Sequence, residues 1–306
     1  MKVRKLILSF FIMLLFTILL RIFMVEIFWV PTASMSPSID EKSYIIVEKV
    51  SYGALLPQSI NQIPWANTLL LISTKFENFL IKDRWNGKRL PGRSKPVKGD
   101  VIVFRDPSNT LYLTKRCIGV PGERISIFSD IWYCDEQERN FSKLVINEWI
   151  VETKHFDLTS YFKVNFVKCN SEYLDGEVVD KVHLNGKQVN ELKALGILKY
   201  LKAPKRKFNL RVEDAASIIK IPAKGDTVVI NMQNYQFYAK IINQFEVKEI
   251  LKSENDIYID GRLNNKYVFE NDYYFLLGDN RSKSIDSRSF GLIPFKNIIG
   301  KILYVL

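Results

Sequence analysis

The sequence predicts a mainly β protein that is anchored by a single N-terminal transmembrane helix. The first 30 residues are almost entirely apolar, whereas the clear patterns beyond residue 40 are short runs of β-branched and aromatic residues, often bounded by Gly, Pro, Asn or Asp. A chain of 306 residues can bury a full core. Because the patterns weaken after residue 128, we expect a main β domain that carries an inserted β-rich subdomain.

The first element is an apolar stretch at residues 6–25 that only Arg21 interrupts. As an α-helix with a rise of about 1.5 Å per residue, it spans about 30 Å, the thickness of the hydrocarbon core of a bilayer. Three basic residues precede the stretch: Lys2, Arg4 and Lys5. The positive-inside rule therefore places residues 1–5 in the cytoplasm and the rest of the chain on the outer side of the membrane.

The alternative interpretation of this stretch is a cleaved secretory signal peptide. Such a peptide has an apolar core of about 7–15 residues, followed by a cleavage site with small residues. Here the apolar stretch is longer, and EIFWV (26–30) follows it. We therefore expect a retained, single-pass anchor. Residues 66–81 are interrupted by Lys75 and Glu77, which favours an amphipathic segment over a second span.

The elements predicted after the anchor are strands. The clearest runs are 43–50, 100–105, 111–120, 124–128, 226–231, 235–242 and 273–278. KGDVIVF (98–104) and KGDTVVI (224–230) repeat one pattern, which predicts the same turn into a strand at two places. We expect the main β domain to comprise 26–128 and 271–306, with 129–270 as the inserted subdomain and 66–96 as a smaller insertion.

Charge and composition limit the partners and cofactors. The net charge is +11, but the chain contains no nucleic-acid-binding motif, so an anionic membrane surface is the better partner. The two histidines, His155 and His183, lie outside any metal-ligand pattern, and the three cysteines form no CxxC pair. We expect neither a metal nor an organic cofactor. Whether Cys134 and Cys169 form a disulfide stays open.

Three segments contain residues suited to nucleophilic catalysis. VPTASMSPSI (30–39) places several hydroxyl groups around two prolines, directly after the membrane. In YLTKRCIGVPGER (112–124), strand alternation puts Lys115 on the same face as Leu111, Leu113 and Cys117. If that face is buried, the pKa of the lysine falls and a neutral amine becomes available as a base. LLGDNRSKSIDSRSFGLIP (276–294) is a polar loop after an apolar strand. Taken singly, the segments also fit a hydroxyl-rich linker, an exposed edge lysine and a structural turn.

Together, and in this order behind an anchor, the segments resemble those of the bacterial type I signal peptidases, a family of Ser/Lys-dyad serine proteases. The matching segments are PTASMSPS (31–38), KGDVIVFRDP (98–107), YLTKRCIGVPGE (112–123) and GDNRSKSIDSRSFGLIP (278–294). The resemblance implies a signal-peptidase-like catalytic β domain at the outer face of the bacterial cytoplasmic membrane. It also implies removal of N-terminal signal peptides from secreted and membrane precursors, and it leaves the oligomeric state open.

The resemblance further implies roles for single residues. Ser34 is expected to be the nucleophile and Lys115 its general base, while Thr32 and the backbone N–H of Ser34 are expected to form the oxyanion hole. Ser284 matches the serine that orients the lysine, and Asp286 matches the acid near it. Four further residues are expected to form an ion-paired scaffold under the site: Asp279, Arg281, Arg288 and Arg116.

Other functions stand as alternatives. A Ser/Lys processing peptidase of the conjugation type would differ by a narrow substrate range, and a self-cleaving repressor would need a DNA-binding module where this chain has its apolar stretch. An inactive, membrane-anchored binding protein would have no chemical need for the five residues Thr32, Ser34, Lys115, Ser284 and Asp286. We therefore expect an active serine endopeptidase whose partners are precursors bearing signal peptides and the lipid bilayer.

Overall fold

The computed structural model describes residues 2–58, 62–63, 87–108, 111–128, 131–134, 146–153, 169–174, 177–185, 188, 191–192, 194, 198–202, 219–246, 248–254 and 256–306. These residues confirm a mainly β protein with one long helix at the N-terminus. The expected amphipathic segment at 66–81, and most of the insertion at 66–96, lie outside the described residues.

Contacts divide the chain into two compact units. The first unit contains Met1–Val30, Ser43–Leu113 and Lys296–Leu306, and the second unit contains Pro31–Lys42 and Thr114–Phe295. The predicted division into a main domain and an insertion at 129–270 stays a prediction.

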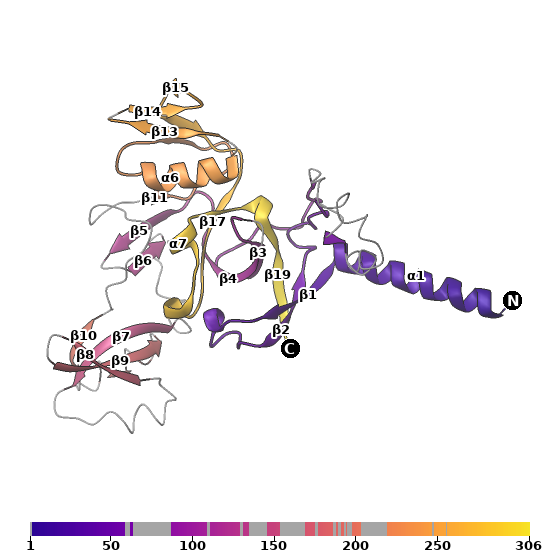
Figure 1. Cartoon of the computed structure of the whole chain (residues 1–306), viewed down its shortest axis with the longest axis horizontal. Coiled ribbons are helices and arrows are strands. Elements are labelled where there is room, and N and C mark those ends of the chain that lie inside the picture. The colour runs from indigo at the N-terminus through magenta and orange to yellow at the C-terminus, as the bar shows by residue number, and fades with distance from the viewer. Residues whose placement is uncertain are drawn as a thin grey trace, which may run out of the picture. The chain divides into compact units, whose positions relative to one another are not determined.

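The first unit joins the apolar helix to a small antiparallel sheet. Helix α1 (Lys2–Phe23) is long and apolar enough to cross a membrane over Val3–Phe23, with a mean hydropathy of 2.7. It ends before the predicted span does, because Val25 already belongs to β1 (Val25–Val30). The sheet order of this unit, which can be followed in Figure 1, is β1, β2 (Ser43–Glu48), β19 (Ile298–Val305) and β3 (Val101–Arg105).

The second unit consists of several small antiparallel sheets. Strand β4 (Tyr112–Gly119) enters this unit at Thr114 and pairs with β17 (Tyr273–Leu277), which also pairs with β18 (Ile293–Pro294). The other described sheets have the orders β11-β5-β6, β10-β7-β9-β8, β12-β16 and β13-β14-β15. Every residue of β17 is buried, so this strand provides a fixed base for the polar loop that follows it.

The strands of these smaller sheets are short. Their bounds are β5 (Arg124–Phe128), β6 (Ile131–Cys134), β7 (Ile146–Thr153), β8 (Cys169–Leu174), β9 (Glu177–Asn185), β10 (Leu198–Lys202), β11 (Ile219–Lys220), β12 (Thr227–Val229), β13 (Ile250–Ser253), β14 (Asp256–Ile259), β15 (Arg262–Leu263) and β16 (Lys266–Val268).

The predicted strand at 235–242 is wrong. These residues form helix α6 (Tyr235–Ile241), which continues into a π-helical turn, η4 (Ile242–Glu246). The helix follows Asn231, whose side-chain oxygen accepts hydrogen bonds from the backbone N–H groups two and three residues further on. A short apolar run fits a strand and a buried helix equally well. A helix forms here because it places the apolar side chains on one buried face. These side chains are Phe237, Tyr238, Ile241, Ile242 and Phe245.

Glu246 holds the π-helical turn against β17. Its buried carboxylate accepts hydrogen bonds from the hydroxyl of Tyr273 at 2.6 Å, the hydroxyl of Tyr267 at 3.2 Å and the side-chain amide of Asn271 at 3.0 Å. The backbone N–H of Glu270 is a fourth donor, at 2.9 Å. Because a buried carboxylate is costly unless it is hydrogen-bonded, these donors fix the turn and the first residue of β17 together.

The repeated KGD pattern forms the same turn in both units, as predicted. Gly99 and Gly225 have φ angles of 91° and 87°, in the region that favours glycine. The side chains of Asp100 and Asp226 accept the backbone N–H three residues earlier, at 3.1 Å and 3.0 Å. The first turn leads into β3 and the second into β12.

Candidate active site

The segment that contains Ser34 connects β1 to β2 and belongs to the second unit, as Pro31–Lys42. Its centre is the 3₁₀ turn η1 (Ala33–Met35). Met35 and Ile39 anchor this turn with exposed fractions of 0% and 3%. The backbone N–H of Asn280 donates to the carbonyl oxygen of Ser34 at 3.1 Å. Apolar burial and this hydrogen bond together hold Ser34 in place.

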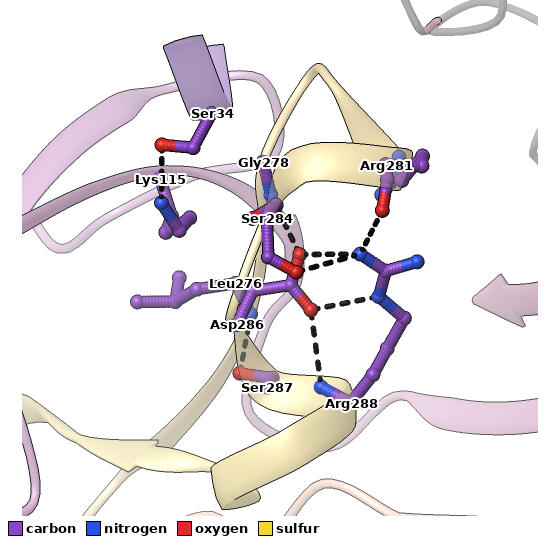
Figure 2. Close-up of polar contacts among 9 residues, drawn as sticks. All are labelled: Ser34, Lys115, Leu276, Gly278, Arg281, Ser284, Asp286, Ser287 and Arg288. Atoms are coloured by element: carbon purple, nitrogen blue, oxygen red, sulfur yellow. Dashed lines mark hydrogen bonds and ion pairs between the residues drawn. The ribbon is translucent and has the colours of Figure 1, made fainter. Parts of the chain in front are cut away.

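Ser34 and Lys115 are in direct contact, as Figure 2 shows. Lys115 Nζ donates to Ser34 Oγ at 2.8 Å, although the two residues lie 81 positions apart in the chain. The hydroxyl of Thr32 donates to the same serine oxygen at 3.3 Å. Ser34 is 7% exposed and Lys115 is 3% exposed. When the amine is neutral, the same contact lets the serine hydroxyl donate to Nζ, which is the geometry that a base needs.

Burial makes Lys115 a candidate base. Removal of the ammonium from water is the largest effect, and it lowers the pKa of Lys115 from 10.5 to about 8. Asp286 and Asp279 raise this pKa, and Arg288 lowers it. Near neutral pH, a larger share of this amine is neutral than in an exposed lysine. The interpretation of Lys115 as an exposed edge residue is therefore wrong.

A buried ion pair organises the loop that follows β17. Arg288 contacts both carboxylate oxygens of Asp286, through Nε at 2.7 Å and Nη2 at 2.8 Å. The backbone N–H of Gly278 donates to Asp286 at 3.0 Å. Burial raises the pKa of Asp286, but the Arg288 charge and these hydrogen bonds outweigh it and keep the pKa below its ordinary value. Arg288 also donates to the carbonyl oxygens of Arg281 at 2.8 Å and Ser284 at 3.4 Å, which closes the loop (Figure 2).

A second ion pair links the same loop to β4. Arg116 contacts both oxygens of Asp279, with Nε–Oδ1 at 2.8 Å and Nη2–Oδ2 at 2.6 Å. The hydroxyl of Ser38 donates to Asp279 Oδ2 at 2.5 Å and accepts from Arg116 at 3.1 Å. The ionic scaffold was predicted without its pairs, and the pairs are Arg116–Asp279 and Arg288–Asp286. Ser38 was not predicted from the sequence as part of this scaffold. Its position in the same hydroxyl-rich segment as Ser34 could have indicated a role near the site.

Gly278 allows the loop and the segment of Ser34 to approach closely. A side chain at Gly278 would collide with Ser284, and its Cβ would lie 2.6 Å from the Ser34 carbonyl oxygen. The hydroxyl of Ser284 is buried beside Gly278 and has no hydrogen-bond partner among the residues that the structure describes. The predicted role of Ser284 in orienting Lys115 therefore stays a prediction.

These contacts define a class of site. A buried serine hydroxyl that is bonded to a buried, partly neutral lysine amine is the arrangement of the Ser/Lys hydrolases, in which lysine takes the place of histidine as the base. The surrounding ion pairs fix the two chain segments that carry the serine and the lysine.

Comparison with known proteins identifies the family. The model of the signal peptidase family, peptidase S26, matches residues 3–176 and 178–306, so the chain belongs to this family. Signal peptidase I of Buchnera aphidicola subsp. Baizongia pistaciae is 26% identical over 97% of this chain and 74% of its own length. Signal peptidase I of Rickettsia akari is 26% identical over 94% of this chain and 73% of its own. A solved signal peptidase I from Enterococcus faecalis aligns with 69% of this chain and 98% of its own, at 18% identity and a TM-score of 0.25.

Proposed function

We propose that this chain is a membrane-anchored serine endopeptidase that removes N-terminal signal peptides from exported precursors. The observation that carries the proposal is the 2.8 Å hydrogen bond between Lys115 Nζ and Ser34 Oγ in buried surroundings. Membership of the signal peptidase family supports the substrate class, because the relatives are signal peptidases. No feature of the described residues favours a narrow conjugation-type substrate or an inactive binding protein.

The reaction starts with Lys115 in its neutral form. The amine takes the hydroxyl proton of Ser34 while Oγ attacks the carbonyl carbon of the scissile peptide bond. When the tetrahedral intermediate collapses, the C–N bond breaks and the Lys115 ammonium gives its proton to the leaving amine of the mature protein. The signal peptide is then an ester of Ser34. Water attacks this ester while Lys115 takes a proton from it. The bond between the carbonyl carbon and Oγ then breaks, the Lys115 ammonium returns the proton to Ser34 Oγ, and the signal peptide leaves as a carboxylic acid that ionises in water.

Thr32 and the backbone N–H of Ser34 are proposed to stabilise the oxyanion of the intermediate. The Thr32 hydroxyl lies 3.3 Å from Ser34 Oγ, so a small rotation is enough to direct it at an oxyanion bound to that serine. A single donor of this kind typically supplies about 2.7–4 kcal/mol of transition-state stabilisation.

The other motif residues are proposed to act by position. Asp286 and Arg288 close the loop beside the site, and their opposite charges also shift the pKa of Lys115 in opposite directions. Asp279 and Arg116 hold the segment of Ser34. Ser284 is proposed to orient the lysine, while Arg281 contributes its carbonyl oxygen to the contact with Arg288.

We infer that α1 is a retained anchor, with residues 1–5 in the cytoplasm and residues 26–306 on the outer side. The basic residues before the apolar stretch support this orientation. Only Met24 separates α1 from β1, and β1 pairs with β2 from Val25 to Val30. Because residues 25–30 are already paired with β2, the stretch directly after α1 is not free to bind a peptidase as an unpaired extended segment. Ser34 then follows the membrane closely, where cleavage sites of precursors emerge.

The test is cleavage of several unrelated secretory precursors by the purified full chain in detergent micelles. We expect mature products with the N-terminus at the signal-peptide junction, and complete loss of cleavage in Ser34→Ala and in Lys115→Ala. Ser36→Ala is the matched control, because it removes a hydroxyl from the same segment without touching the dyad, and it should cleave normally. Normal cleavage by either dyad variant would refute the proposal. Cleavage of a single precursor only would point to the conjugation-type peptidase.

A further inference from the structure

A small pocket in the first unit lies at the end of α1 and is surrounded by cations. Its volume is about 40 Å³, and its charged lining residues are Arg21, Glu26, Lys49 and Arg105. All four belong to the first unit, and Arg21 lies in the last turn of α1. Three positive charges and one negative charge give the lining a formal charge of +2.

The only carboxylate among these lining residues is already engaged. Glu26 Oε2 lies 2.8 Å from Lys49 Nζ, and Glu26 Oε1 lies 3.2 Å from Arg21 Nη2. Lys49 is 7% exposed and also donates to the backbone carbonyl oxygen of Arg21 at 2.9 Å. The single negative charge of Glu26 therefore balances one of the two positive charges beside it, and its ion pairs are with Arg21 and Lys49.

Arg105 carries a buried charge whose side-chain contacts, among the residues that the structure describes, are with neutral groups. The residue is 8% exposed, and its two Nη atoms donate to the side-chain oxygens of Gln58 and Gln62, both at 2.9 Å. Its guanidinium carbon lies 5.9 Å from the ring centre of Tyr112. Its Nε is buried and has no hydrogen-bond partner within the described part of the chain. Burying a guanidinium without an opposite charge is costly, because the hydration that it loses is not replaced.

We propose that this pocket binds a phosphate oxyanion, supplied by the headgroup of an anionic phospholipid. An oxygen of the phosphate would give Arg105 its missing acceptor and its missing negative charge, and guanidinium groups bind phosphate through paired N–H donors. The pocket volume equals that of a few water molecules, which suits phosphate oxygens and is too small for a nucleotide.

The position of the pocket favours a lipid as the source of the phosphate. If α1 crosses the membrane, its last turn lies at the level of the headgroups, where phosphodiesters are concentrated. The proposal rests on α1 as a membrane anchor and does not depend on peptidase activity. A free phosphate ion has the same chemistry, so the experiment must separate the two sources.

The experiment measures unfolding of the full chain in non-ionic detergent with three probes. They are short-chain phosphatidylglycerol, short-chain phosphatidylcholine and inorganic phosphate. We expect phosphatidylglycerol to raise the unfolding midpoint by roughly 4 °C at about a 100-fold excess over its Kd, and the other two probes to have little effect. Equal stabilisation by inorganic phosphate would overturn the lipid assignment, and equal stabilisation by phosphatidylcholine would overturn the requirement for an anionic headgroup.

Three variants test the site itself. Arg105→Gln should weaken the affinity for phosphatidylglycerol at least about tenfold, because it removes a charge-assisted contact. Arg21→Gln should also weaken the affinity for phosphatidylglycerol. Because the Arg21 side chain is 42% exposed, this variant tests the site even if Arg105→Gln does not fold. Arg93→Gln is the matched control, because Arg93 is an exposed arginine of the same unit outside the pocket. Equal affinities in these three variants would overturn the proposal.

Cleavage of a precursor in lipid-free detergent separates this proposal from the proposed function. Arg105→Gln should cleave like the wild type there, whereas Ser34→Ala should bind phosphatidylglycerol like the wild type and cleave nothing. If the wild type binds phosphatidylglycerol but cleaves no precursor, the proposed phosphate pocket is supported and the proposed peptidase function is refuted.

Discussion

Replacing Lys115 by methionine is expected to stabilise the protein at neutral pH while it abolishes activity. Burial lowers the pKa of Lys115 from 10.5 to about 8, so the folded protein binds this proton more weakly than the unfolded chain does. Below pH 8 the lysine is charged in both states, and the full cost of burying the charge opposes folding. A fall of the pKa from 10.5 to about 8 corresponds to about 3 kcal/mol of folding free energy. Methionine has a similar volume and no charge, so Lys115→Met removes this cost.

The pH dependence separates the charge from changes in packing. Between pH 8 and 10.5 the unfolded chain holds more protons than the folded protein, so the stability of the wild type rises with pH in this window. Relative to Lys115→Met, the wild type should gain about 2 kcal/mol between pH 7 and pH 9.5. The other titrating groups are common to both proteins and cancel in the comparison.

The assay is guanidinium unfolding of both proteins in the same detergent at the two pH values, followed by tryptophan fluorescence. Lys115→Met should be the more stable protein at pH 7, and its advantage should shrink at pH 9.5. An advantage that does not change with pH would refute the argument that a buried charge lowers the stability. So would a variant that is less stable than the wild type at pH 7.

Three further predictions concern the site. The value of kcat/KM should rise about tenfold per pH unit below pH 8 and level off above it, because the neutral fraction of Lys115 limits the rate; a midpoint near 4 or above 10 in the pH profile would contradict this. Ser284→Ala should lower kcat without a change in the unfolding midpoint, because its hydroxyl has no hydrogen-bond partner among the described residues. A decrease of about 1 kcal/mol in the free energy of unfolding, as for a broken hydrogen bond, would contradict this prediction. Gly278→Ala should lose both activity and stability, since its methyl group would lie 2.6 Å from the Ser34 carbonyl oxygen; wild-type unfolding and kcat would show that the loop can move away.

Features of the fold that depend on local pattern were predictable from the sequence. The apolar helix follows from continuous hydrophobicity, and the KGD turns follow from a glycine that tolerates positive φ. The end of α1 was misplaced because apolar residues continue into β1, where hydropathy does not distinguish a helix from a strand. The helix at Tyr235–Ile241 was missed because its apolar residues fit either element until tertiary packing decides.

The site was predictable in its residues but not in its contacts. The roles of Ser34 and Lys115 came from the family resemblance, and their contact joins residues 81 positions apart. The contact of Ser38 with Asp279 joins residues 241 positions apart. Strand alternation predicted the burial of Lys115 only in part, because Leu111 on the same face is 61% exposed. Long-range packing, which a local pattern does not encode, decides which arginine pairs with which aspartate.

The segment of Ser34 has a consequence for the newly made protein. Val30 faces Ser43 across β1 and β2, so a local hairpin closes this segment early in the chain. Lys115 and Asp279 follow much later in the sequence, and their contacts with Ser34 and Ser38 wait until those residues have been synthesised. In a nascent chain Ser34 therefore has no base within reach. The dyad and the ion pairs around it are complete only after the loop that contains Asp279 and Asp286 has been synthesised and has folded.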